Sequence, residues 1–272
     1  TANQAMESLA TDGYCYRRPK HGSFYQEPSS GKRKLCAVLL SKLGILDDEI
    51  EMEYYNGLYI YGMENEIDIA SIHSSPEKAF RFYHNLDKVD LCGMVILGKN
   101  AVDSTIELAK QFPEQRFIFL LPRITSILRP LPENCYVILN NDFDGGFRLA
   151  EYYASRGVKK MAILTAELEK DDLTYQTRIK GFLHAADKYG IKFDPENDFI
   201  QCNPTCKHFG QRQSAYLATR AYLANRNEIP DVIFAVNDNL AAGSLEAVQS
   251  LEYQNCIAVT GYDGVFRSAV IS

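Results

Sequence analysis

Along residues 35–264, continuous apolar runs alternate with segments whose apolar residues recur at helical spacing. Short continuous apolar runs have the length of strands buried in a parallel sheet. They lie at 35–40, 66–71, 92–97, 116–121, 137–139, 160–165, 232–236 and 256–260. Segments with apolar residues at helical spacing lie between them, at 49–61, 76–86, 101–111, 145–156, 175–189, 210–225 and from 240 onward. This alternation predicts an α/β fold with parallel sheets that are covered by helices on both faces.

The pattern is doubled. Four strand–helix units precede about residue 140 and a similar set follows it. We therefore predict two Rossmann-like subdomains, an N-subdomain of about 35–140 and a C-subdomain of about 141–264. No short-period internal repeat accompanies the doubling.

The stretch 230–243, PDVIFAVNDNLAAG, holds the clearest junction between a strand and a helix. The apolar run stops at Asn237 and Asp238, and a helical pattern begins at Leu240. In open α/β sheets ligands bind at this carboxyl edge, but a polar residue here also serves as a helix cap. We expect Asp238 to cap the helix and Asn237 to reach a ligand.

Further polar residues stand at other predicted strand ends and helix starts, namely Asp144, Arg178 and Asp263. Carboxylates, amides and guanidinium groups form planar forks that bind neighbouring hydroxyls of a small polar ligand. The alternative is structural: helix capping for Asp142, Asp144 and Asp238, and a surface ion pair for Arg178.

The first 26 residues follow a different pattern. Apolar residues at helical spacing end at Gly13, and two short strand-like segments then flank the basic turn at 17–22. Helix, strand, basic turn and strand form the back half of a winged helix, in which cations on the turn contact phosphates. A surface hairpin with incidental charges is the alternative.

The distribution of charge suggests different functions for residues 1–34 and for the rest of the chain. The 272 residues carry a formal charge of −6, whereas residues 1–34 hold six basic and three acidic groups. The seven cysteines are scattered, and Cys202, Cys206 and His208 fit no standard zinc spacing, so we expect no metal and no cofactor. No signal peptide or apolar run of membrane length is present, which favours a reducing cytoplasm.

The order T-x-x-x-A-M-x-x-L-x-x-x-G-x-x-x-R-R-P-x-x-G-S-F resembles the end of the DNA-binding domain of the gluconate-repressor (GntR) family. The resemblance implies a recognition helix and wing at 1–26, a linker at 27–34, and further helices ahead of Thr1. Asn3 replaces a usual arginine and Lys20 replaces the first wing glycine. The implied DNA contacts are Thr1, Asn3, Gln4, Arg17, Arg18, Lys20, His21 and Gly22.

The segments NNDFDGGFRLAEYYASRGV, TRIKGF, PDVIFAVNDNLAAG and VTGYDG resemble the lac- and galactose-repressor family and the periplasmic sugar-binding proteins that share its fold. The resemblance implies an effector-binding domain at 35–272, incomplete at its C-terminal end, that binds a sugar between two subdomains. A wing joined to such a domain resembles arabinose-repressor-like regulators. The implied effector contacts are Asp144, Arg178, Asn237 and Asp263, with Ser41 and Arg123 from the first subdomain.

Together these features predict a cytoplasmic, homodimeric transcriptional repressor whose operator binding is controlled by a mono- or oligosaccharide. The alternative is a periplasmic-type solute receptor, which would need a secretory signal and has no use for the basic segment. An enzyme is not expected. No G-x-G-x-x-G follows the first strand, and the five histidines have no spacing that suggests a catalytic triad.

Overall fold

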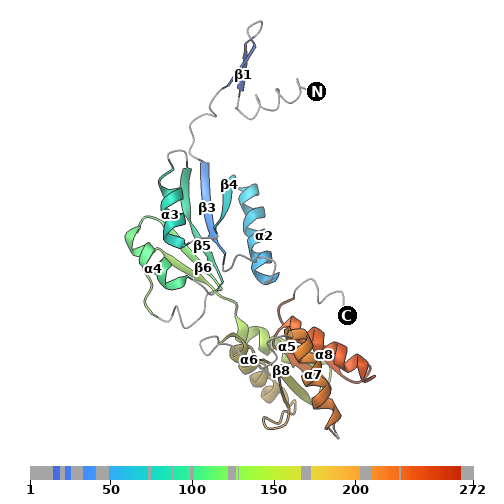
Figure 1. The fold of residues 1–272 in the computed structure, drawn as a ribbon. Helices are drawn as coiled ribbons and strands as arrows, with labels where there is room; N and C mark the ends of the chain where they lie inside the picture. Colours follow the sequence, from blue (N-terminus) through green and yellow to red (C-terminus); the bar gives the residue numbers. More distant parts are fainter. Residues whose placement is uncertain are drawn as a thin grey trace. The chain divides into compact units, whose positions relative to one another are not determined.

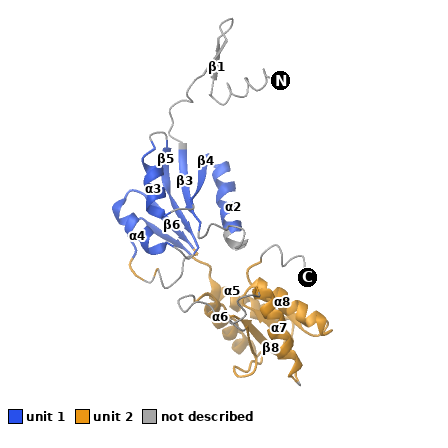
Figure 2. Ribbon diagram, in the orientation of Figure 1, with its two compact units in different colours: residues 1–47, 51–120, 131–138 blue, residues 48–50, 121–130, 139–272 orange. Residues whose placement is uncertain are grey.

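The computed structural model describes residues 15–18, 22–25, 33–40, 49–72, 75–86, 89–98, 101–121, 127, 129–166, 173–202, 210–226 and 228–264 (Figure 1). The chain divides into two compact units (Figure 2). Unit 1 comprises residues 1–47, 51–120 and 131–138, and unit 2 comprises residues 48–50, 121–130 and 139–272.

A hairpin lies near the N-terminus. Its strands, β1 (Cys15–Arg18) and β2 (Gly22–Tyr25), pair antiparallel, with Cys15 opposite Tyr25 and Arg18 opposite Gly22. The two predicted strands are therefore found, whereas the turn between them and the helix predicted before them lie outside the described residues. That the hairpin is a wing stays a prediction.

The sheet of unit 1 has five parallel strands in the order β4-β3-β5-β6-β7. The strands are β3 (Arg33–Leu39), β4 (Ile67–Ile72), β5 (Val89–Leu97), β6 (Arg116–Leu120) and β7 (Cys135–Ile138). Its helices are α2 (Glu49–Glu64), α3 (Pro76–His84) and α4 (Val102–Gln111). Side chains of the central strands such as Val38, Ile96 and Phe117 are buried, as expected for a parallel sheet covered by helices.

Local sequence explains the start of α3. Ser75 caps the helix, its hydroxyl accepting the Lys78 amide at 3.4 Å, and Pro76 occupies the first helical position. The fully buried Phe80 then packs on Phe117 with ring centroids 5.3 Å apart, which fixes the helix on the sheet.

The sheet of unit 2 has four parallel strands in the order β11-β10-β8-β9. The strands are β8 (Met161–Thr165), β9 (Phe199–Gln201), β10 (Val232–Ala235) and β11 (Ala258–Thr260). The helices are α5 (Asp142–Ser155), α6 (Thr174–Tyr189), α7 (Gln211–Ala224) and α8 (Asp238–Ser250). Phe182 of α6 and Phe234 of β10 stack at 4.1 Å in its core.

The two sheets share one winding pattern. In each, the second strand pairs on one side of the first, and the third and fourth follow on the other side. The predicted α/β class with two Rossmann-like subdomains is thus confirmed. Strand β9 was not predicted, because three residues in which only Ile200 is buried give no apolar run. In the described part of the chain, no helix is both long and apolar enough to cross a lipid bilayer.

Candidate functional site

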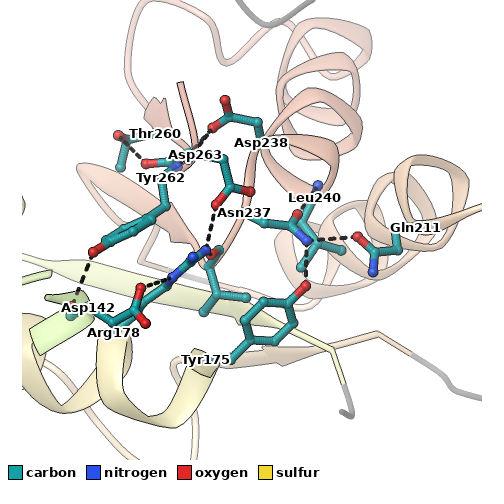
Figure 3. A network of polar contacts seen from close by, with 12 residues as sticks. Asp142, Tyr175, Arg178, Gln211, Asn237, Asp238, Leu240, Thr260, Tyr262 and Asp263 are labelled. Atoms are coloured by element: carbon teal, nitrogen blue, oxygen red, sulfur yellow. Dashed lines mark hydrogen bonds and ion pairs between the residues drawn. The ribbon is translucent and has the colours of Figure 1, made fainter. Parts of the chain in front are cut away.

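Polar side chains gather at the carboxyl edge of the unit 2 sheet (Figure 3). We call this set the polar network; it consists of Asp142, Tyr175, Arg178, Gln211, Asn237, Asp238, Tyr262 and Asp263. It forms because parallel strands end at the same edge of a sheet. The chain leaves β8 toward β9 on one side and returns to β10 on the other. The neighbouring ends of β8 and β10 are therefore a topological switch point, where open α/β sheets bind ligands.

Arg178 of α6 lies at the centre of the network and is 5% exposed. Its Nε donates to Asp142 Oδ1 at 2.9 Å, and its Nη1 donates to Asp263 Oδ1 at 2.8 Å and to the Val236 carbonyl at 2.7 Å. The guanidinium carbon also lies 3.9 Å from the ring centroid of Tyr262. Burial disfavours the charged guanidinium, but the two carboxylates outweigh burial and raise the pKa of Arg178.

Asp238 shapes the turn that follows β11. Its Oδ1 accepts the backbone amides of Tyr262 at 2.8 Å and Asp263 at 3.2 Å. A β-carbon at Gly261 would lie 2.0 Å from that oxygen, so the turn requires glycine. Burial raises the pKa of the Asp263 carboxyl, and the attraction of Arg178 partly opposes the rise. Burial also raises the pKa of Tyr262, to about 12.

Asn237 uses its whole side chain. Its Oδ1 accepts the Leu240 amide at 2.8 Å and caps α8, while its Nδ2 donates to the Tyr175 hydroxyl at 2.6 Å and to Gln211 Oε1 at 2.8 Å. The expectation that Asp238 caps this helix is therefore wrong. The helix begins at Asp238, one residue later than the cap, because the Asn237 backbone is still extended.

The structure brings together three of the residues predicted to bind the effector, Arg178, Asn237 and Asp263. Arg178 is buried, so the surface ion pair considered for it is excluded. Asp144 lies apart from the network: its Oδ2 accepts from Arg148 at 2.6 Å, one turn along α5, and its side chain is 44% exposed. Asp142 is the residue of α5 that reaches Arg178.

The side chains of the remaining predicted contacts lie outside the part of the chain that the structure describes. Ser41 and Arg123 lie outside the described residues. So do five of the predicted DNA contacts, namely Thr1, Asn3, Gln4, Lys20 and His21. For Arg17, Arg18 and Gly22 only the backbone of the hairpin is described.

Five members of the network were not predicted as ligand contacts, and one of them, Asp238, was expected only to cap its helix. Tyr175 stands three residues before Arg178, so helical spacing indicated that the two share a face. Asp142 had been weighed only as a cap. Tyr262 stands beside Asp263 at the predicted end of the last strand, whereas Gln211 reaches the network through tertiary packing and no local pattern marked it. Within the described residues, no group of three or more His, Cys, Asp or Glu side chains is arranged to hold a metal ion.

Comparisons with known proteins find similarity to transcriptional repressors and regulators. No family model matches the chain. The transcriptional repressor PurR of Histophilus somni (strain 2336) is 24% identical over 254 residues, which cover 90% of this chain and 71% of that protein. The transcription regulator GntR from Chromobacterium violaceum superposes with a TM-score of 0.58 and 17% identity, covering 84% of this chain and 78% of the other.

A LacI-family transcriptional regulator from Enterococcus faecium, solved with bound ribose, matches with a TM-score of 0.58 and 20% identity. The match covers 85% of this chain and 78% of the other. Identities this low establish the fold alone. The chain therefore has the α/β fold of LacI-family transcriptional regulators, and its sequence is similar to that of PurR repressors.

Proposed function

We propose that this protein is a cytoplasmic, DNA-binding transcriptional repressor, and not an enzyme, whose operator binding is controlled by a small effector. The observation that carries the proposal is the buried polar network at the switch point of unit 2, which joins the ends of β10 and β11 to the starts of four helices, α5 to α8. Its position is that of a ligand site in an open α/β sheet. The similarity to PurR repressors supports the regulatory role.

We propose a mono- or oligosaccharide as the effector. Carboxylates and amides in fixed orientation suit the neighbouring hydroxyls of a sugar, and the tyrosines Tyr175 and Tyr262 supply aromatic surface in a chain without tryptophan. Structural relatives were solved with ribose and with glucose bound. We assign Arg178, Asn237 and Asp263 to this site, with Asp144, Ser41 and Arg123 as further proposed contacts.

We propose that the hairpin of β1 and β2 is the wing of a GntR-type winged helix. Arg17 and Arg18 of β1 belong to a basic segment of the sequence, so the hairpin would present cations to operator phosphates. The effector changes operator affinity only if it binds one conformation of the repressor better than another.

The sugar site is tested by calorimetry with a panel of pentoses and hexoses on the full chain. We expect one of them to bind, and Asp263→Ala to weaken that binding at least tenfold, because a buried hydrogen bond to a charged group contributes about 1.5–3 kcal/mol. Lys110→Ala, at an exposed ion pair with Glu107 on α4, serves as the control and should bind normally. A panel without any binder, or an Asp263→Ala protein that binds like the parent, would contradict the assignment.

We further propose a homodimer that buries the exposed surface of α2. Tyr59, Ile60, Tyr61 and Met63 are 49%, 55%, 60% and 68% exposed there, while Gly62 packs the helix against β4. Aromatic residues and methionine are enriched in interfaces between protein chains.

Mass measurement by light scattering tests the dimer. Tyr59 and Met63 lie one helical turn apart, so the pair Tyr59→Glu and Met63→Glu should weaken dimerisation at least tenfold through desolvated charge. Leu217→Glu, at a 46% exposed position of α7, is the matched control. A parent protein that stays monomeric at micromolar concentration would exclude the dimer.

A further inference from the structure

The polar network carries more negative than positive charge. It contains one guanidinium, Arg178, and three carboxylates, Asp142, Asp238 and Asp263, a formal balance of −2 from +1 and −3. The network is largely shielded from solvent: Arg178, Asp142 and Asp238 are buried, and the Asp263 side chain is 11% exposed. Charge in such a place is weakly screened, so its sign matters to any ligand that enters.

The charge of Arg178 is already matched. Its Nε and Nη1 donate to two carboxylates and a carbonyl, and the Tyr262 ring covers the guanidinium. A phosphate or carboxylate of a ligand that approached Arg178 would also approach Asp142 and Asp263. It would gain one attraction against two repulsions, and it would lose its own hydration.

Neighbouring cations are matched as well. Arg212, next to Gln211, pairs with Glu246 of α8, and Arg148 pairs with Asp144 on α5. The amide donors of Asn237 are also occupied, since Nδ2 donates to both Tyr175 and Gln211. None of the arginines Arg148, Arg178 and Arg212 therefore offers an unmatched positive charge to an anion.

Acceptors remain for a ligand. Asp142 and Asp263 both bind Arg178 through Oδ1, and a carboxylate has about four acceptor positions on its two oxygens. Hydroxyl and amine groups are the donors that such oxygens prefer, and an uncharged polyol brings them without repulsion.

From this balance we infer that the site selects uncharged, hydroxyl- or amine-bearing effectors and rejects their phosphorylated and carboxylated forms. The inference rests on the proposed function, because it assumes that the polar network contacts the effector. It adds that the protein distinguishes a free sugar from its phosphate ester or its sugar acid.

Matched ligand pairs test the inference by calorimetry on the full chain. The probes are ribose and ribose 5-phosphate, glucose and glucose 6-phosphate, and glucose and glucuronate. We expect the sugar that binds to do so at least a hundredfold more tightly than its anionic partner. The ratio should change little as salt is added, because salt screens charges only weakly in a buried site.

A charge variant separates repulsion from shape. Asp142→Asn keeps the size of the side chain and removes one negative charge, so the ratio between sugar and sugar phosphate should shrink at least tenfold. Glu228→Gln, at the pair with Lys160 ahead of β8, should leave the ratio unchanged. A sugar phosphate that binds as tightly as the free sugar, or a ratio that Asp142→Asn does not change, overturns the inference but leaves the effector function standing. Binding by no member of any pair overturns the proposed function and the inference with it.

Discussion

Replacing Arg178 with alanine is expected to destabilise unit 2 by about 3–5 kcal/mol, the cost of removing one partner from a buried ion pair. The loss leaves the carboxylates of Asp142 and Asp263, whose side chains are 9% and 11% exposed, without their cation. It also deprives the Val236 carbonyl of a donor at 2.7 Å. Urea unfolding followed by circular dichroism measures the total effect, and hydrogen exchange of the β8 and β10 amides assigns it to unit 2.

The pH dependence of this variant distinguishes lost charge pairing from lost packing. Burial already raises the pKa of the Asp263 carboxyl, and loss of the opposing attraction of Arg178 raises it further. A carboxyl with a raised pKa in the folded state destabilises the fold above that pKa, and this penalty disappears as the pH falls and the group takes up its proton. The deficit of Arg178→Ala should therefore shrink between pH 7 and pH 5. A deficit that is constant with pH would indicate packing alone.

Arg148→Ala is the matched control. Arg148 also pairs with an aspartate, through its Nε at 2.6 Å, but its side chain is 74% exposed and that of Asp144 is 44% exposed. Exposed pairs of this kind contribute little, because water and salt screen them. We expect no measurable change in the free energy of unfolding. If Arg178→Ala behaved like Arg148→Ala, the polar network would not be a buried ion-pair cluster in solution.

The contrast between Asp142 and Asp144 also shows what limits prediction from sequence. The run NNDFDGG offers several residues that cap helices well, and the sequence pattern placed the helix start at Gly145. The structure caps α5 with Asn141, whose side chain accepts the Asp144 amide, so the helix begins three residues earlier. That shift rotates Asp144 toward solvent and leaves Asp142 at the sheet edge. Helix phase, rather than residue type, decides which carboxylate joins the site.

The buried strands and the edge at which they end follow from apolar runs several residues long, so these features were predictable from the sequence. The apolar run of β10 is completely buried, and its length and composition marked it as a central strand. Arg178, Asn237 and Asp263 were predicted as neighbours because parallel strands share an edge. Gln211 joins them only through the packing of α7 against α8, where a β-carbon at Gly243 would lie 1.9 Å from the Arg212 carbonyl. Contacts of that kind depend on how the helices pack in the folded chain, and the periodicity of apolar residues in the sequence does not indicate them.

A second large loss of stability is expected from substitutions at the glycines where α5 packs against α6. A β-carbon at Gly181 would lie 1.9 Å from the Phe143 carbonyl oxygen, and one at Gly146 would lie 2.2 Å from the Arg178 carbonyl oxygen. Both obstacles are backbone atoms, so neither can move without moving a helix. The two glycines therefore set the separation of the helices that carry Arg178 and Asp142.

Gly181→Ala should destabilise unit 2 by about 1–3 kcal/mol, the usual cost of overpacking, although alanine favours a helix by about 1 kcal/mol over glycine. Gly57→Ala in α2 is the control, because no atom lies within 4 Å of the added carbon and only the helical preference remains. We expect that variant to be as stable as the parent or slightly more stable in urea unfolding. Because the clash separates α5 from α6, Gly181→Ala should also weaken sugar binding without touching the ligand. A Gly181→Ala protein as stable as Gly57→Ala would mean that the helices do not approach this closely, and the geometry that holds Asp142 against Arg178 would then need another cause.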